Sequence, residues 1–209
     1  MRGPIATLLL ALLAQPGQAE APDECECLWE GPFTDVQAVT DLVVSGSVER
    51  VRGNAVDLQV DAVLRGDQDL PSIRIWMKTA DYCRPEAKRF PVGSQWVMAL
   101  DRIDKQVPGG FNPSTPNISY GRVGDYELSA CGGYFLSQTG NLVTGNLAEG
   151  ARWDYEPKMN PVLLDLVSDF VAGKIPASAL LEASHQDPEV RNMLLDTKAF
   201  LRGDDAYID

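Results

Sequence analysis

Four cysteines are the residues of this sequence with the clearest capacity for chemistry. Cys25 and Cys27 flank Glu26 near the start of the chain, whereas Cys83 and Cys131 each stand alone much farther along. Thiols can form disulfides, bind a soft metal ion or cycle between dithiol and disulfide. Side chains two positions apart in an extended segment emerge on the same face, so Cys25 and Cys27 can connect one N-terminal segment to two other parts of the fold.

Residues 1–19 have the features of a signal peptide. Arg2 precedes an apolar run from Ile5 to Ala14, and small residues lead to the expected cleavage site after Ala19. The apolar run is too short to cross a bilayer, which takes about 20 helical residues. We therefore expect an exported, soluble protein in an extracytoplasmic space, either periplasmic or secreted, with no membrane span.

An oxidising compartment favours two disulfides for the four cysteines. A bond between Cys25 and Cys27 is disfavoured, because residues i and i+2 of an extended strand lie about 6.5–7 Å apart, at or beyond the usual Cα separation. Each of the two therefore takes one distant partner, Cys83 or Cys131, and this argument leaves both pairings open. On the chain-entropy model each long closure stabilises the fold by about 4–5 kcal/mol.

Two alternatives use the same sulfur atoms. Two thiolates spaced one residue apart can share a soft cation such as copper(I), but the sequence lacks the two close cysteine pairs of a usual zinc site. A thiol oxidoreductase needs a readily ionised thiol, and the acidic Asp23, Glu24 and Glu26 disfavour a thiolate here. We therefore expect no metal and no cofactor. The single histidine, His185, is expected to be a surface or capping residue.

The sequence carries no motif for hydrolysis or phosphate binding. It has no Gly-x-Ser-x-Gly, no His-Glu-x-x-His and no glycine-rich phosphate loop, and one histidine gives little basis for a catalytic triad. We expect a protein that is not an enzyme. Arg65-Gly66-Asp67 and Arg202-Gly203-Asp204 match an adhesion tripeptide, but turn chemistry explains both.

The 18 basic and 30 acidic residues give the chain a net charge of −12. This balance argues against the phosphate backbone of nucleic acids and against anionic membrane surfaces as partners. Trp76, Trp96 and Tyr134 offer aromatic rings that could stack on bases, but packing in the strand core accounts for them better. We expect no nucleic-acid partner.

Residues 20–150 are expected to form a β domain. Alternating apolar residues and turn sequences predict five or more short strands, a spacing typical of a small barrel or sandwich. The expected strands cover residues 42–51, 55–64, 73–77, 96–100 and 126–130, followed by a hairpin that turns near Gly140 and ends near Leu147. A short helix is expected at residues 34–39.

Residues 151–209 are expected to form a small helical appendage packed on the β domain. A helix is predicted from Asn160-Pro161 to Gly173, with a further turn or two after Pro176 and another helix at 187–203. The fold class is therefore mainly β with C-terminal helices.

Several of these features, taken in order, resemble the netrin-like module. They are Cys25-Glu26-Cys27, the short helix, the hairpin of residues 42–64, the lone Cys83, the strand Pro91–Leu100 and Ser129-Ala130-Cys131-Gly132-Gly133. The chain is most similar to secreted bacterial members and, more remotely, to tissue inhibitors of metalloproteinases. The resemblance covers residues 25 to about 147. It implies a five-stranded OB-like antiparallel barrel in which Cys25 and Cys27 are bonded to separate downstream cysteines.

The resemblance also raises the question of protease inhibition. Inhibitors of this class bind the protease zinc through the α-amine and carbonyl of an N-terminal cysteine, whereas five residues, Glu20 to Glu24, precede Cys25 after cleavage at Ala19. A peptide nitrogen has no basic lone pair for the metal. We therefore expect an exported non-enzymatic binding or interaction module, whose ridge Cys25-Glu26-Cys27 contacts an unidentified protein or ligand. The alternatives are a metalloprotease inhibitor that acts through the same ridge and a Cys-x-Cys metal-binding or thiol-redox protein.

Overall fold

The residues of this 209-residue chain that its computed structural model describes are 25–79, 82–107, 110, 119–148 and 159–185. The expected signal peptide, the expected helix at 187–203 and the second Arg-Gly-Asp sequence lie outside them. The expected boundary at residue 150 does too. No helix within the described part is long and apolar enough to cross a membrane.

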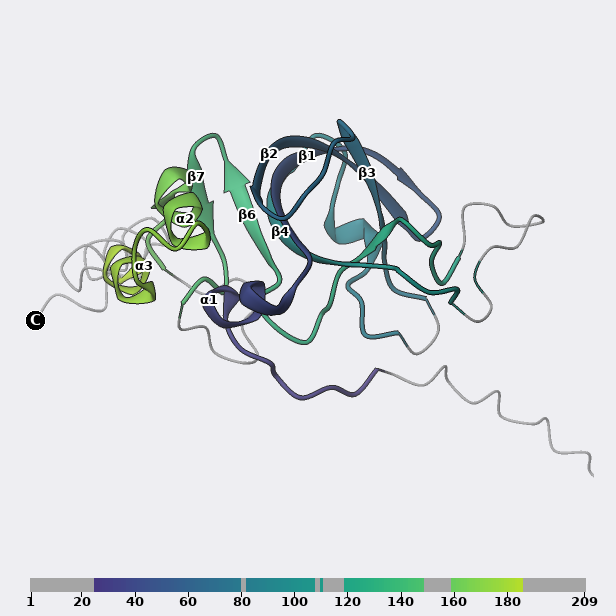
Figure 1. The fold of residues 1–209 in the computed structure, drawn as a ribbon, viewed down its shortest axis with the longest axis horizontal. Coiled ribbons are helices and arrows are strands. Elements are labelled where there is room, and N and C mark those ends of the chain that lie inside the picture. Colours follow the sequence, from purple (N-terminus) through teal and green to yellow (C-terminus); the bar gives the residue numbers. More distant parts are fainter. Residues whose placement is uncertain (1–24, 80–81, 108–109, 111–118, 149–158, 186–209) are drawn as a thin grey trace, which may run out of the picture.

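Five strands close into a barrel (Figure 1). They are β1 (Leu42–Arg52), β2 (Ala55–Arg65), β3 (Ser72–Trp76), β4 (Gln95–Arg102) and β5 (Tyr126–Glu127). Backbone pairing joins them in the order β1-β2-β3-β5-β4, and β4 pairs again with β1, which closes the ring. The expected fold class, a five-stranded OB-like barrel with C-terminal helices, is confirmed.

One pairing departs from the antiparallel arrangement that we expected. β3 and β5 run parallel, with Ile75 opposite Tyr126, whereas the other four neighbours in the ring are antiparallel. A closed ring with an odd number of strands cannot alternate direction all the way round. At least one neighbouring pair must therefore be parallel, and here the shortest strand supplies it.

Strand β1 bends so that it pairs with β2 along one edge and with β4 along the other. Gly46 allows the close approach, because a Cβ there would lie 2.3 Å from the carbonyl oxygen of Gln59 on β2. Register shifts at Val43/Val44 and Ser45/Gly46 accompany the bend.

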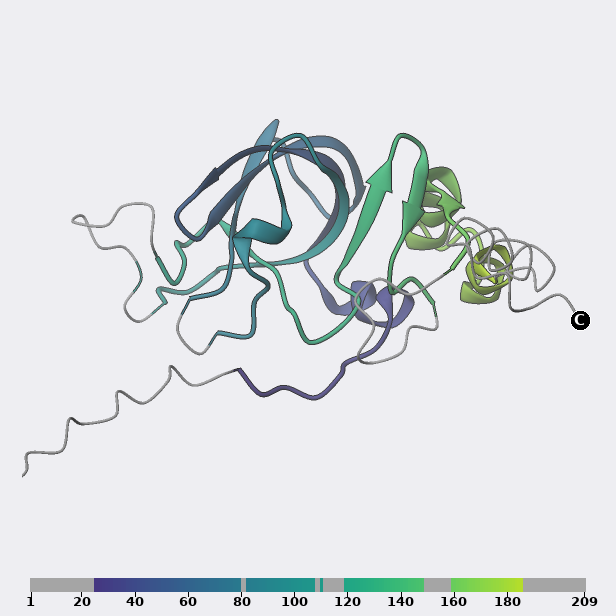
Figure 2. The same ribbon diagram turned by 180° about the vertical axis from the view of Figure 1, so that it is seen from behind.

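Three strands continue the sheet from the edge of β4 (Figure 2). They are β6 (Phe135–Thr139), β7 (Leu142–Thr144) and β8 (Val162–Leu163). The expected hairpin at Gly140 is confirmed as β6 and β7, and Gly140 takes a φ of 60° in its turn. β5 and β6 both pair with the same edge of β4, so the chain between them runs alongside that strand.

Helix α2 (Leu164–Val171) begins later than we predicted. Val162 pairs with Val143 of β7 and its side chain is buried, and the amide of Leu164 donates to the carbonyl oxygen of Asn141 at 2.8 Å. Burial of Val162 against the sheet therefore outweighs the helix-start signal of Asn160-Pro161. The helix ends before Gly173, as predicted, and α3 (Ala177–Ser184) follows Pro176.

The helices and the barrel share one hydrophobic core. Val167 and Val171 of α2 and Leu180 of α3 belong to the same buried cluster as the barrel residues. The rings of Phe90 and Trp96 meet edge to face with centroids 4.8 Å apart inside it. Trp76, Trp96 and Tyr134 are all buried, which confirms their expected core positions.

The expected short helix is present as α1 (Phe33–Val36) followed by the 3-10 helix η1 (Gln37–Val39). Arg65, at the end of β2, donates hydrogen bonds of 2.8 Å to the carbonyl oxygens of Ala38 and Thr40. Gly66 follows with a φ of 87°. Arg65 therefore holds η1 in place from the end of β2, and Gly66 turns the chain out of the strand, in line with the turn expected for Arg65-Gly66-Asp67.

Candidate functional site

The segment before α1, residues 25–32, runs under the barrel in an extended conformation without joining the sheet (Figure 1). Its C-terminal half is bound to the chain between β5 and β6. The amide of Glu30 donates to the carbonyl oxygen of Cys131 at 2.8 Å, and the amide of Gly133 donates to that of Gly31 at 2.9 Å. Among the described residues, no backbone partner is found for residues 25–29.

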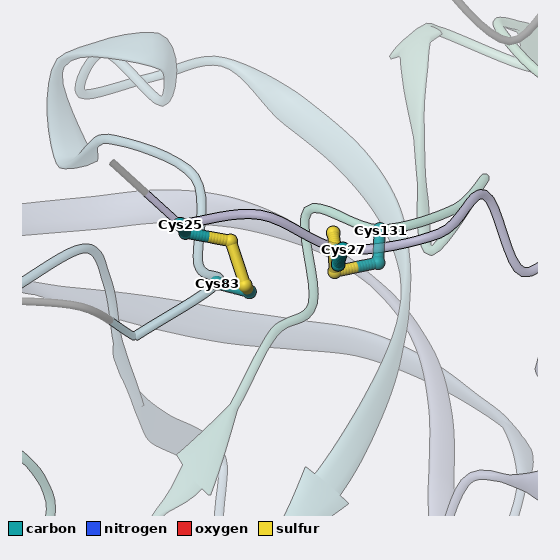
Figure 3. Close-up of side chains that lie close together, drawn as sticks. All are labelled: Cys25, Cys27, Cys83 and Cys131. Atoms are coloured by element: carbon teal, nitrogen blue, oxygen red, sulfur yellow. A yellow bond between two sulfur atoms is a disulfide. The ribbon is translucent and has the colours of Figure 1, made fainter. Parts of the chain in front are cut away.

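Two disulfides hold the N-terminal half of this segment (Figure 3). Cys25 is bonded to Cys83 with a Cα separation of 5.1 Å, and Cys27 is bonded to Cys131 with a Cα separation of 5.8 Å. This confirms the two expected disulfides and decides between the two pairings that the geometric argument left open. None of the four cysteines is free in the described chain.

The two distant partners come from neighbouring loops. Cys83 lies between β3 and the 3-10 helix η2 (Ala87–Arg89), and Cys131 lies where the chain passes β4 from β5 to β6. The amide of Ala130 donates to the carbonyl oxygen of Cys83 at 2.9 Å, so the loops are also joined by their backbones. All four Sγ atoms consequently lie within 4.8 Å of one another.

Two hollows border the ridge Cys25-Glu26-Cys27. The first, of about 590 Å³, is lined by residues 25–29 together with Ala130 and Cys131. Leu28 stands at this hollow with 80% of its surface exposed. The ridge and Leu28 therefore present an apolar side chain and the hydrogen-bonding groups of an extended backbone on one accessible surface.

The second hollow, of about 620 Å³, is basic. Beside the cysteines it is lined by Lys78, Arg84, Lys88 and Arg89, with Glu86 as the one acidic residue of the lining. We refer to it as the basic hollow. Lys88 forms an exposed ion pair with Glu86. The lining therefore carries four basic side chains and one acidic one, in a chain whose net charge is strongly negative.

Arg84 fixes the wall of the basic hollow. Its side chain is only 3% exposed, its guanidinium donates to the carbonyl oxygen of Tyr120 at 2.6 Å, and it pairs with the carboxylate of Glu127 on β5. The ring of Tyr82 lies 4.5 Å from the guanidinium carbon. The basic hollow was not predicted from the sequence. The sequence does carry one signal for it, because residues 78–89 contain four basic side chains and only two acidic ones.

Several acidic groups lie close together where the N-terminal segment enters the fold. The Tyr134 hydroxyl donates to the Glu30 carboxylate, and burial together with this hydrogen bond raises the pKa of Tyr134. Burial raises the pKa of Asp101 to about 6, and the negative charges of Asp41, Glu127 and Glu30 add to the shift. Asp101 faces Glu127 across the β4–β5 pairing.

The described residues place one group of possible metal ligands together, the four cysteines. All four sulfur atoms are engaged in disulfides, which are poor ligands compared with thiolates. His185 is exposed and caps the end of α3, as expected, and its side chain is not part of this group. The expectation that the protein is not an enzyme stays a prediction.

No family model, curated protein or solved structure matches this chain. The closed five-stranded barrel and the two disulfides are compatible with an OB-like fold.

The pairing of the disulfides can be read directly by peptide mapping. Cleavage after Glu26 separates Cys25 from Cys27, so mass spectrometry of the unreduced digest should find Cys25 linked to Cys83 and Cys27 linked to Cys131. The same digest after reduction is the control, in which both linked masses should disappear. Peptides that join Cys25 to Cys131, or Cys25 to Cys27, would contradict the structure.

Asp101 should make the stability depend on pH. Its folded-state pKa of about 6 lies above the ordinary 3.8, so the charged form destabilises the fold and stability falls as pH rises through this interval. Asp101→Asn should therefore raise the free energy of unfolding at pH 8 by about 1 kcal/mol, allowing for solvent screening, and change it little at pH 4. Urea unfolding measures both, with exposed Asp104→Asn as control. An equal gain at both pH values would contradict the assignment.

Proposed function

We propose that this protein is an exported, non-enzymatic binding module of the netrin-like type, which contacts a partner protein or ligand through the ridge Cys25-Glu26-Cys27 and Leu28. One observation carries the proposal. The ridge is an extended, accessible segment whose backbone has no described hydrogen-bond partner, yet two disulfides fix its conformation. A segment that is already ordered loses little conformational entropy when it binds.

The form of the ridge also suggests how a partner would engage it. Unpaired amide and carbonyl groups of an extended segment can accept an added strand, while exposed apolar side chains supply specificity. Leu28 is exposed, and the first hollow lies beside it. A partner with an extended segment and an apolar side chain fits this surface best.

An extracytoplasmic location is part of the proposal. Disulfides persist in oxidising compartments, and the described chain keeps all four cysteines in that form. The sequence of residues 1–19 supports export independently, through its basic start, apolar run and small residues before the cleavage site.

Binding through the ridge can be tested with one substitution at Leu28. The mature protein, from Glu20 onward, is immobilised to capture a partner from the matching extracytoplasmic fraction, and the affinity of the captured partner is then measured by calorimetry. Leu28→Asp should weaken binding at least about tenfold, because it places a charge at the apolar contact. Leu70→Asp is the control, since Leu70 is also exposed, at 63%, but lies in the loop before β3. Equal affinities for the two variants would contradict a binding role of the ridge.

Metalloprotease inhibition through the ridge is the second candidate. It is favoured by the exposure of the ridge and by the family resemblance, but zinc chelation requires that Cys25 be the first residue of the mature chain. We expect N-terminal sequencing of the exported protein to begin at Glu20, and we expect this form to leave a panel of zinc metalloproteases uninhibited. A mature chain that begins at Cys25 and inhibits a protease, with inhibition lost when residues 20–24 are restored, would establish this candidate instead.

A further inference from the structure

The basic hollow has no part in the binding function proposed above. It measures about 620 Å³, within the usual size range of ligand-binding pockets. Its lining carries four basic side chains and one acidic one, whereas the whole chain has 18 basic and 30 acidic residues. Positive charge gathered in one hollow of an acidic protein attracts a negatively charged group to that place.

Two of the four cations, Arg84 and Arg89, are held in the wall of the hollow by the fold. Arg84 is almost fully buried, donates to the carbonyl oxygen of Tyr120 and pairs with the carboxylate of Glu127. The guanidinium carbon of Arg89 lies 5.0 Å from the ring centroid of Phe135, which belongs to the core. Both guanidinium groups are therefore in position before a ligand arrives, so binding costs little rearrangement of the wall.

The other two cations, Lys78 and Lys88, are exposed and already stabilise one carboxylate at the hollow. The hydrogen bond and charge of Lys88 lower the pKa of Glu86, and the charge of Lys78 adds to the effect. An ion pair as exposed as that of Lys88 and Glu86 is weak, because water competes for both groups. The two lysines can therefore turn to a carboxylate that a ligand brings.

The ridge connects the basic hollow to the apolar contact at Leu28. Cys25 and Cys27 line both hollows, and Leu28 lines the first. Three residue steps along an extended chain, from Cys25 to Leu28, span about 10 Å. An extended segment of a partner that lies along the ridge therefore reaches both surfaces within about five residues. Alternate side chains of such a segment share one face, so acidic and apolar side chains two or four positions apart can point to the ridge together.

We propose that the partner of the ridge carries an acidic segment, whose carboxylates enter the basic hollow while an apolar side chain two to four residues away contacts Leu28. This inference rests on the binding function proposed above and names the chemistry of the partner. A peptide suits the surface better than a polyanion such as a sulfated polysaccharide, because a peptide supplies backbone groups for the unpaired backbone of the ridge. The strongly negative net charge of the chain also repels a long polyanion.

Synthetic peptides test the preference for negative charge. The probe is Glu-Thr-Glu-Ser-Leu, blocked at both ends, and its reversed sequence is used as well because a strand can add in either direction. The neutral control has Gln in place of both Glu residues. The mature chain from Glu20 onward should bind the acidic peptide at least about fivefold more tightly than the neutral one, as measured by NMR titration at low ionic strength.

A pair of lysine substitutions locates this preference. Lys78→Gln/Lys88→Gln should abolish it, because the variant lacks the two exposed cations of the hollow and keeps the arginines of the wall. Arg52→Gln/Lys105→Gln changes the net charge equally, at exposed positions outside the lining, and should retain the preference. Equal affinities of the unmodified chain for the two peptides, absence of binding, or a preference that survives in the lysine variant would overturn the proposal.

Leu28→Ser distinguishes this inference from the function of the ridge. It should weaken binding of the acidic and neutral peptides by the same factor and leave the preference unchanged. A loss of affinity for peptides that the unmodified chain binds equally would support the ridge and contradict the acidic segment. A preference for the acidic peptide, with both affinities unchanged in Leu28→Ser, would contradict the ridge and support the carboxylate ligand of the hollow.

Two other occupants of the basic hollow would give different results. Heparin, as a sulfated polysaccharide, should displace the acidic peptide only at a higher concentration of charged groups than the peptide itself. Displacement at a lower concentration would assign the hollow to sulfate groups and overturn the proposal. Glu20→Gln/Asp23→Asn/Glu24→Gln neutralises the acids that precede Cys25 in the sequence and should raise the peptide affinity less than about tenfold. A larger gain would assign the hollow to residues 20–24 and would equally overturn the proposal.

Discussion

The position of the N-terminal segment depends on covalent sulfur bonds, because residues 25–29 gain nothing from the hydrogen bonding of the sheet. Alternation in an extended segment places Cys25 and Cys27 on the same face, and the two bonds lead to loops that already touch through Ala130 and Cys83. The disulfides join cysteines 58 and 104 positions apart in the sequence, so each one restricts the unfolded chain strongly. An accessible ridge can thus be rigid without being buried.

Closure of the barrel explains why these loops meet. β3 and β4 run in opposite directions, so β5 between them must be parallel to one of the two. It runs parallel to β3 and antiparallel to β4, and the chain then passes along β4 to reach β6. That passage contains Cys131, which is bonded to Cys27 in the first half of the N-terminal segment. It also contains Tyr134, whose hydroxyl donates to Glu30 in the second half. The topology of the sheet therefore determines where the ridge lies.

Sequence patterns identified most elements of this fold, because local signals dominate there. The alternation from Leu42 and the hairpin at Gly140 each depend on a few neighbouring residues. The start of α2 could not be predicted in this way, since Val162 is held by a contact with Val143 about twenty residues away in the sequence. The disulfide pairing is likewise set by tertiary contacts, and so is the basic hollow. Both depend on the loops of Cys83 and Cys131 lying side by side in the fold.

One acidic residue of β5, Glu127, connects the charged groups near the ridge. Arg84 is buried beside the sulfur atoms and is held by Glu127, which in turn faces Asp101 across the β4–β5 pairing. Glu127 therefore compensates a cation on one side, and on the other its charge adds to burial, the main cause of the raised pKa of Asp101. The short strand β5 thus links the wall of the basic hollow to the carboxyl group of Asp101.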